Sequence, residues 1–116
     1  MMKIEVDEAY AFDMLAIMEL KAEYSPTDMN KIIKEEFLKT IRKQLGNELT
    51  SDIRASYEYS QLLDANRKAY LLVDRIFADE EFSAHLVHNA NMERYQWKRK
   101  IQHNFFGQDL NEQKTV

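Results

Sequence analysis

Residues 55–77, ASYEYSQLLDANRKAYLLVDRIF, repeat their apolar side chains at intervals of three or four positions. That spacing is typical of a helix with one buried stripe, because 3.6 residues complete a helical turn. The stripe passes through positions 55, 59, 62, 63, 66, 70, 73 and 77, and position 66 is an asparagine. The pattern predicts a long helix that begins after a cap at Thr50 or Ser51 and ends near residue 77.

The next segment predicts an antiparallel partner for this helix. Residues 78–82, ADEEF, interrupt the apolar pattern and offer Asp79 as a cap. A second helix then extends from about residue 80 to residue 106, before Gly107. Each helix has about 27 residues, which corresponds to about 40 Å at the rise of an α-helix. Because the link is short, we expect a long antiparallel hairpin.

Two shorter helices precede the hairpin. Residues 9–24, AYAFDMLAIMELKAEY, predict one that ends near Tyr24. Ser25 is expected to cap the next helix, with Pro26 at the first helical position and Asp28 in the first turn; its span is about residues 27–45. Gly46 then suits the left-handed conformation that often follows a helix.

The composition supports an all-helical fold. The 116 residues include two glycines and one proline, whereas an all-β chain needs many more turn residues. Four amphipathic helices with short connections predict an up-and-down four-helix bundle built on the long hairpin. The length fits one domain, which we expect at residues 1–107, followed by a frayed tail at 108–116.

Polar side chains interrupt the apolar stripes of three predicted helices. At about 100° per residue, Asp13 falls in the middle of the stripe of its helix. The full set is Asp13, Asn66, Asn91, Arg94 and Lys98. An unpaired carboxylate in an apolar interior costs several kcal/mol. Asp13 therefore predicts a donor or a cation beside it, and the other four residues are the candidates.

This polar set has two interpretations. In one, it is a buried hydrogen-bonded network that fixes the register of the helices, as a core asparagine does in coiled coils. In the other, it lines a pocket between helices that binds a small polar ligand. Arg94 and Lys98 would then favour an anion. We treat all five as candidate ligand-binding residues.

Three stretches resemble an uncharacterised family of small helical bacterial proteins, with related chains in phage, some encoded among polysaccharide and lipopolysaccharide biosynthesis genes. They are residues 11–21 (AFDMLAIMELK), 62–76 (LLDANRKAYLLVDRI) and 89–102 (NANMERYQWKRKIQ). The residues that match the family pattern are Asp13, Ile17, Glu19 and Lys21, then Asn66, Tyr70 and Asp74, and finally Asn91, Arg94 and Lys98. The chain departs from the pattern at Val73, where the family has an acid, and at Phe77, where it has an arginine.

Composition also limits the partners. There is no cysteine, which excludes thiolate metal sites and cysteine nucleophiles. A formal net charge of −4 argues against nucleic acid as a partner. No apolar run approaches the roughly 20 residues that cross a bilayer, and the first ten residues lack a secretory signal. We expect a cytoplasmic protein without a nucleic-acid or membrane partner.

A metal site and a basic surface are further hypotheses. Glu81, His85 and His88 share a helical face and could ligate a metal, but no inward histidine or glutamate on another helix completes the set. We expect no metal and no cofactor. The run RYQWKRKIQH at 94–103 places cations near a helix C-terminus, where they complement the helix dipole. A solvated helix end is one interpretation of this run, and a surface for an anionic partner is the other.

The alternative function is an all-helical, Mg-dependent nucleoside-triphosphate pyrophosphohydrolase, in which acidic pairs on neighbouring helices hold the metal. Residues 34–39, KEEFLK, resemble the beginning of such a motif, but Lys39 stands where a third acid is wanted. Asp64 and Asp74 do not form a second inward pair. We therefore favour a binding or assembly module over an enzyme. Because long helices in a short chain leave apolar surface uncovered at one end, we also expect a homodimer.

Overall fold

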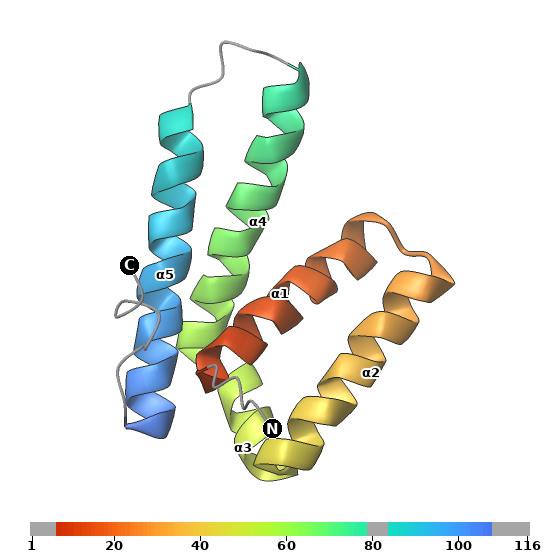
Figure 1. The fold of residues 1–116 in the computed structure, drawn as a ribbon, viewed down its shortest axis with the longest axis vertical. Helices are drawn as coiled ribbons and strands as arrows, with labels where there is room; N and C mark the ends of the chain where they lie inside the picture. The colour runs from red at the N-terminus through yellow and green to blue at the C-terminus, as the bar shows by residue number, and fades with distance from the viewer. Residues whose placement is uncertain (1–6, 79–83, 108–116) are drawn as a thin grey trace, which may run out of the picture.

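The computed structural model describes residues 7–78 and 84–107, and every regular element in these two ranges is an α-helix (Figure 1). The helices are α1 (Glu8–Tyr24), α2 (Asp28–Leu45), α3 (Asn47–Arg54), α4 (Tyr57–Ala78) and α5 (Ala84–Phe106). The all-helical prediction is confirmed. The predicted cap at Asp79 and the predicted frayed tail at 108–116 lie outside the described residues.

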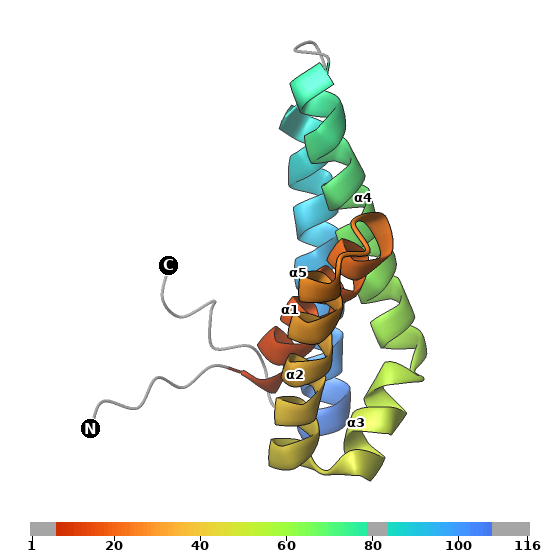
Figure 2. The same ribbon diagram turned by 90° about the vertical axis from the view of Figure 1, so that its right-hand side faces the viewer.

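The two long helices, α4 and α5, form an antiparallel hairpin, as the sequence predicts (Figure 1). Helix α1 crosses this hairpin obliquely and packs against both of its helices and against α2. Helix α2 packs mainly against α1 and α3. Figure 2 shows α3 at one end of the molecule, where it leads from α2 into α4. Helix α1 therefore lies at the centre of the fold.

The long helix predicted from residue 51 onward is divided into α3 and α4 in the structure, which gives five helices where four were expected. The chain turns at Ser56, whose hydroxyl donates to the carbonyl of Ile53 (2.6 Å) and accepts the backbone N–H of Tyr59 (3.1 Å). That second bond satisfies a backbone donor that has no partner within the new helix. Ser56 is thus the residue that separates the two helices.

The expected cap at Thr50 or Ser51 is wrong, because α3 begins directly after Gly46. Gly46 has a φ of +91°, a conformation that glycine adopts without a steric penalty. This turn leads from α2 into α3 without a linker. Thr50 is buried inside α3, where its hydroxyl donates to the carbonyl of Gly46 (2.7 Å).

The cap of α2 also differs from the prediction. Thr27, and not Ser25, is the N-cap, and its hydroxyl accepts the backbone N–H of Asn30 (3.1 Å). Ser25 belongs to the end of α1, where its backbone N–H donates to the carbonyl of Lys21 (2.9 Å). Pro26 therefore precedes the cap of α2 instead of opening the helix. The predicted end of α1 at Tyr24 is confirmed.

The core gathers where α1 meets the other helices. Its buried members are Ala9, Phe12, Leu15, Ala16, Leu38, Ile41, Ile53, Tyr59, Leu62 and Ile101. Buried Gln102 of α5 joins this region to the beginning of α1, since it accepts the backbone N–H of Ala9 (2.9 Å) and donates to Glu8 (2.7 Å). Within the described parts of the chain, no helix has the length and apolar character needed to cross a membrane.

Candidate functional site

Asp13 is buried, with a relative exposure of 3%, and its carboxylate is held by side chains from two other helices. Asn66 of α4 donates to Oδ1 (2.9 Å), and Arg94 of α5 donates to Oδ2 (3.0 Å). The Nζ of Lys98 lies 3.8 Å from Oδ2. We call these four residues the Asp13 network. The donor and the cation that a buried acid requires are therefore both present.

The helices position the network through their spacing and register. Arg94 and Lys98 are four residues apart, so they project from the same side of α5. Asn66 is fixed by a second bond, in which its amide donates to the carbonyl of Leu62 (3.1 Å) one turn earlier in α4. Buried Lys98 also lies over the ring of Tyr10, with Nζ 4.2 Å from the ring centroid. The network thus joins α1, α4 and α5.

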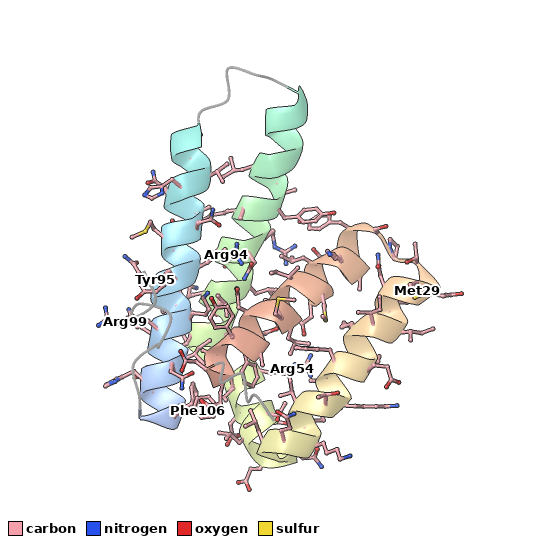
Figure 3. The ribbon with its side chains drawn as sticks, in the orientation of Figure 1. Met29, Arg54, Arg94, Tyr95, Arg99 and Phe106 are labelled. Atoms are coloured by element: carbon pink, nitrogen blue, oxygen red, sulfur yellow. The ribbon has the colours of Figure 1, made fainter. Side chains whose placement is uncertain are left out.

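Asn91, the fifth predicted residue, is exposed and lies outside the buried network. Its amide oxygen accepts a hydrogen bond from Nη1 of Arg94 (3.0 Å). The guanidinium is therefore held through Nη1 by Asn91 and through Nη2 by the buried carboxylate of Asp13. The Arg94 side chain is labelled in Figure 3.

A pocket of about 400 Å³ lies against the network, between α1, α4 and α5. We call it the interhelical pocket, and it is lined by Ile17, Leu20, Asn66, Ala69, Tyr70, Val87, Asn91 and Arg94. Three of the five predicted residues thus line it, while Asp13 and Lys98 lie outside the lining. Arg94 is the one charged residue among the described residues of the lining, and its Nε is buried without a hydrogen-bond partner there.

A second polar cluster, which the sequence analysis missed, lies on another side of α1. Glu19 accepts hydrogen bonds from Arg54 (2.9 Å) and from the hydroxyl of Tyr59 (3.0 Å). Burial, and then the neighbouring Glu19 carboxylate, raise the pKa of the Tyr59 phenol well above its usual value. The helical periodicity identifies Tyr59 only as an apolar stripe position. The signal that could have revealed the cluster is that a buried tyrosine hydroxyl needs a partner.

The acidic groups considered for metal binding do not assemble in the described part of the chain. Glu35 and Glu36 are exposed on α2, and each lies 3.6 Å from a lysine, Lys34 and Lys39 respectively. Asp64 is exposed on α4, and the side chain of Asp74 lies outside the described residues. The side chains of Glu81 and His85 also lie outside the described residues. Among the residues that the structure describes, no three His, Asp or Glu side chains form a metal-binding group.

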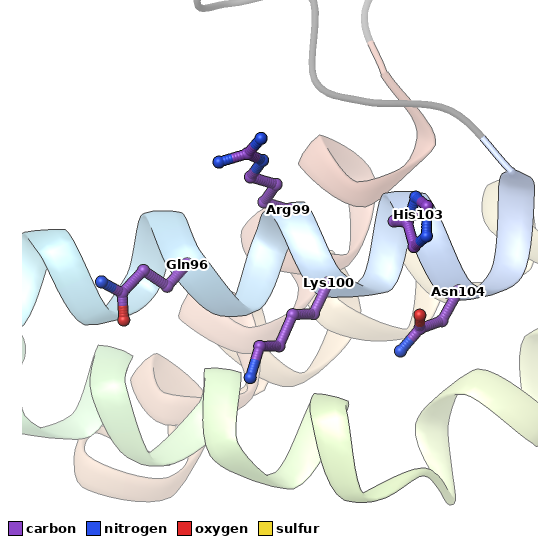
Figure 4. Close-up of a pocket in the computed structure, with 5 residues that line it drawn as sticks. All are labelled: Gln96, Arg99, Lys100, His103 and Asn104. Atoms are coloured by element: carbon purple, nitrogen blue, oxygen red, sulfur yellow. The ribbon is translucent and has the colours of Figure 1, made fainter.

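The basic run of α5 divides between two faces. Arg94 and Lys98 turn inward to Asp13, whereas Arg99 and Lys100 are exposed. The outward face contains a shallow depression of about 640 Å³, lined by Gln96, Arg99, Lys100, His103 and Asn104 (Figure 4). All five lining residues are exposed, and Nζ of Lys100 lies 4.4 Å from the centroid of the Trp97 ring. This face therefore has the character of a solvated helix surface.

Comparison with known protein families, curated proteins and solved structures gives no match to this chain. The resemblance to the bacterial and phage family therefore stays a prediction, and the geometry of the interhelical pocket is the observation that bears on function.

Proposed function

We propose that this chain is a helical binding module that holds a small polar or anionic ligand in the interhelical pocket. The observation that carries the proposal is the position of Arg94, the one charged group among the described residues of the lining. Arg94 and Lys98 carry two positive charges against the single carboxylate of Asp13, and the one net positive charge favours a ligand of opposite charge. Asn91, whose amide oxygen accepts from Arg94, adds an amide nitrogen that can donate to the same ligand.

Arg94 is suited to this role because its position is set before any ligand arrives. Asp13 and Asn91 hold two of its nitrogens, and a group that is already ordered loses less entropy on binding. The guanidinium has five N–H donors in a planar fork that matches a carboxylate.

The competing explanation is that the network only fixes the register of α1, α4 and α5. Titration with acetate and with inorganic phosphate, followed by NMR of ¹⁵N-labelled protein, separates the two. We expect saturable shifts at backbone amides around the pocket, those of Ile17, Ala69 and Asn91 included. The shifts should disappear in Arg94→Gln and persist in Lys68→Gln, which removes an exposed cation of α4. Absence of saturable shifts with both anions would contradict the proposal.

Arg94→Gln leaves the buried carboxylate of Asp13 with less compensation, so the variant is also made in an Asp13→Asn background. In that background both the charge and its partner are absent, which limits the damage to the fold. If the double variant folds and still binds the anions as the wild type does, Arg94 is not the binding group.

We also propose that, within one chain, α1, α2, α4 and α5 form an up-and-down bundle, with α3 as part of a connection. We further propose that two chains associate into a homodimer. The support is the exposure of three large apolar side chains near the beginning of α2, which packs mainly against α1 and α3. They are Met29 (65% exposed), Ile32 (57%) and Ile33 (44%). A contiguous apolar patch of this kind commonly marks a contact between proteins.

A further inference from the structure

The interhelical pocket changes from polar to apolar along the α4–α5 hairpin. The Lys68–Glu93 ion pair (3.1 Å) shows that these two positions lie at the same level of the antiparallel helices. Asn66 and Arg94 are therefore also close in level, next to Asp13. From that level, Tyr70 follows one turn later in α4, and Val87 lies two turns earlier in α5. Both lie toward the end of the hairpin marked by Ala78 and Ala84.

The two ends of the pocket offer different chemistry. At one end, Arg94 and Asn91 provide N–H donors. At the other, Tyr70 and Val87 provide an aromatic ring and a branched aliphatic group, and Leu20 adds an apolar side chain from α1. A ligand that lies along the pocket therefore meets a cation at one end and apolar surface at the other.

The aromatic wall at the apolar end is held in place from outside the pocket. The ring of Tyr70 stacks on that of Tyr24, with centroids 5.2 Å apart and an interplanar angle of 12°. The hydroxyl of Tyr24 accepts a hydrogen bond from Arg67 (3.0 Å), and Arg67 also pairs with Glu23. Tyr70 thus contributes a supported surface to the pocket, against which an apolar ligand group can pack.

We infer that the ligand is an amphiphilic monoanion, a carboxylate with an apolar body. This inference depends on the proposed function, since it names the class of ligand for the same pocket. The carboxylate binds Arg94 and the amide nitrogen of Asn91, and the apolar body extends toward Tyr70 and Val87. Arg94 and Lys98 share the single carboxylate of Asp13, so the network keeps one net positive charge, which matches one negative charge on the ligand. A dianion would leave a second charge uncompensated beside apolar side chains. A volume of about 400 Å³ is within the range of small-molecule sites.

The test is a series of straight-chain carboxylates, acetate, butanoate, hexanoate and octanoate, titrated into the wild-type chain and followed by NMR of the Ile17, Leu20 and Val87 methyl groups. Each added methylene that enters the pocket should increase the affinity about fourfold, the fold-change equivalent to about 0.8 kcal/mol. Hexanamide, which has the same body without the charge, should bind at least tenfold more weakly than hexanoate. Inorganic phosphate should bind more weakly than butanoate.

Two variants assign the ends of the ligand. Val87→Ser should reduce the gain from chain length while acetate binding is retained, and Leu86→Ser is its matched control, since Leu86 is an exposed neighbour outside the pocket lining. Arg94→Gln should remove the preference for hexanoate over hexanamide. Circular dichroism first establishes that each variant is folded to the same extent as the wild type, and the affinities are then compared.

The outcomes separate this inference from the proposed function. If acetate and phosphate bind in the pocket and longer chains bind no better, the apolar body is wrong and the anion site stands. If hexanamide binds as tightly as hexanoate, the monoanion is wrong and a site for a polar ligand stands. If no member of the series and no phosphate gives saturable shifts, both the inference and the proposed function are overturned.

Discussion

Replacing Asp13 by alanine removes a carboxylate that three side chains share. The change takes the hydrogen-bond acceptor from Asn66 and the counter-charge from Arg94 and Lys98. Breaking a buried ion pair by removing one partner costs about 3–5 kcal/mol. The Arg94 side chain is 25% exposed and can be partly solvated, whereas that of Lys98 is only 10% exposed. We therefore expect a loss of about 3 kcal/mol in the free energy of unfolding, at the lower end of that range.

Urea unfolding followed by circular dichroism measures this loss, and Glu93→Ala is the control. Glu93 pairs with Lys68 at 3.1 Å, but both side chains are well exposed, at 43% and 61%. An exposed pair contributes about 0–1 kcal/mol. Each substitution thus removes the acid of an ion pair, a buried acid in the case of Asp13 and an exposed one in the case of Glu93. If Asp13→Ala costs no more than Glu93→Ala, the carboxylate of Asp13 is not a buried partner of the two cations.

Double-mutant cycles locate the partner of Asp13. Asp13→Asn is combined with Arg94→Met and, separately, with Lys98→Met. Arg94 donates a hydrogen bond at 3.0 Å, whereas Lys98 lies at 3.8 Å, so the coupling should be larger for Arg94. Residues in one network commonly couple by about 0.5–3 kcal/mol. Additive effects in both cycles would refute the network.

Three further predictions concern other parts of the molecule. Because its pKa is raised, the Tyr59 phenol contributes stability that is present below its unfolded pKa of 10.0 and is lost as the pH rises above it. The alkaline loss of stability should be smaller in Tyr59→Phe; equal losses would contradict it. In light scattering, the wild type should have about twice the chain mass of 13.8 kDa, and Ile32→Glu should have the mass of a single chain. A wild-type monomer at high concentration would exclude the dimer. Calorimetric titration should give no saturable heat with Mg²⁺; saturable binding would favour the pyrophosphohydrolase alternative.

The helical periodicity predicted the fold class and the α4–α5 hairpin, because a buried stripe on a long helix requires a partner of similar length. It did not predict the break at Ser56. Two apolar positions, Ala55 and Tyr59, fall on either side of the break at helical spacing, so the stripe continues through it. Ala55 is exposed in the structure, whereas Ile53 of α3 is buried. The periodicity therefore predicted a buried position at Ala55, whereas the side chain is exposed in the structure.

The candidate site was easier to predict than the topology, because it depends on a local requirement. A carboxylate in an apolar stripe needs a cation or a donor wherever the helices lie, and few residues of that kind fall on inward faces. The cluster of Glu19, Arg54 and Tyr59 could not be identified in the same way. Arg54 lies at the end of α3, a helix that the periodicity did not separate from α4, so its direction could not be derived.

The two polar clusters together fix how α1 crosses α4. Asp13 and Glu19 are six residues apart, which corresponds to about 120° around the helix, so they project from different sides of α1. Their partners on α4, Asn66 and Tyr59, are seven residues apart and project from nearly the same side. A rotation of α1 by one residue, about 100°, would withdraw both carboxylates from these donors. Apolar packing alone tolerates such a change more readily, because it is not directional. The two acids, buried Asp13 and half-buried Glu19, therefore select one orientation of α1, and the same orientation places Ile17 and Leu20 in the wall of the interhelical pocket.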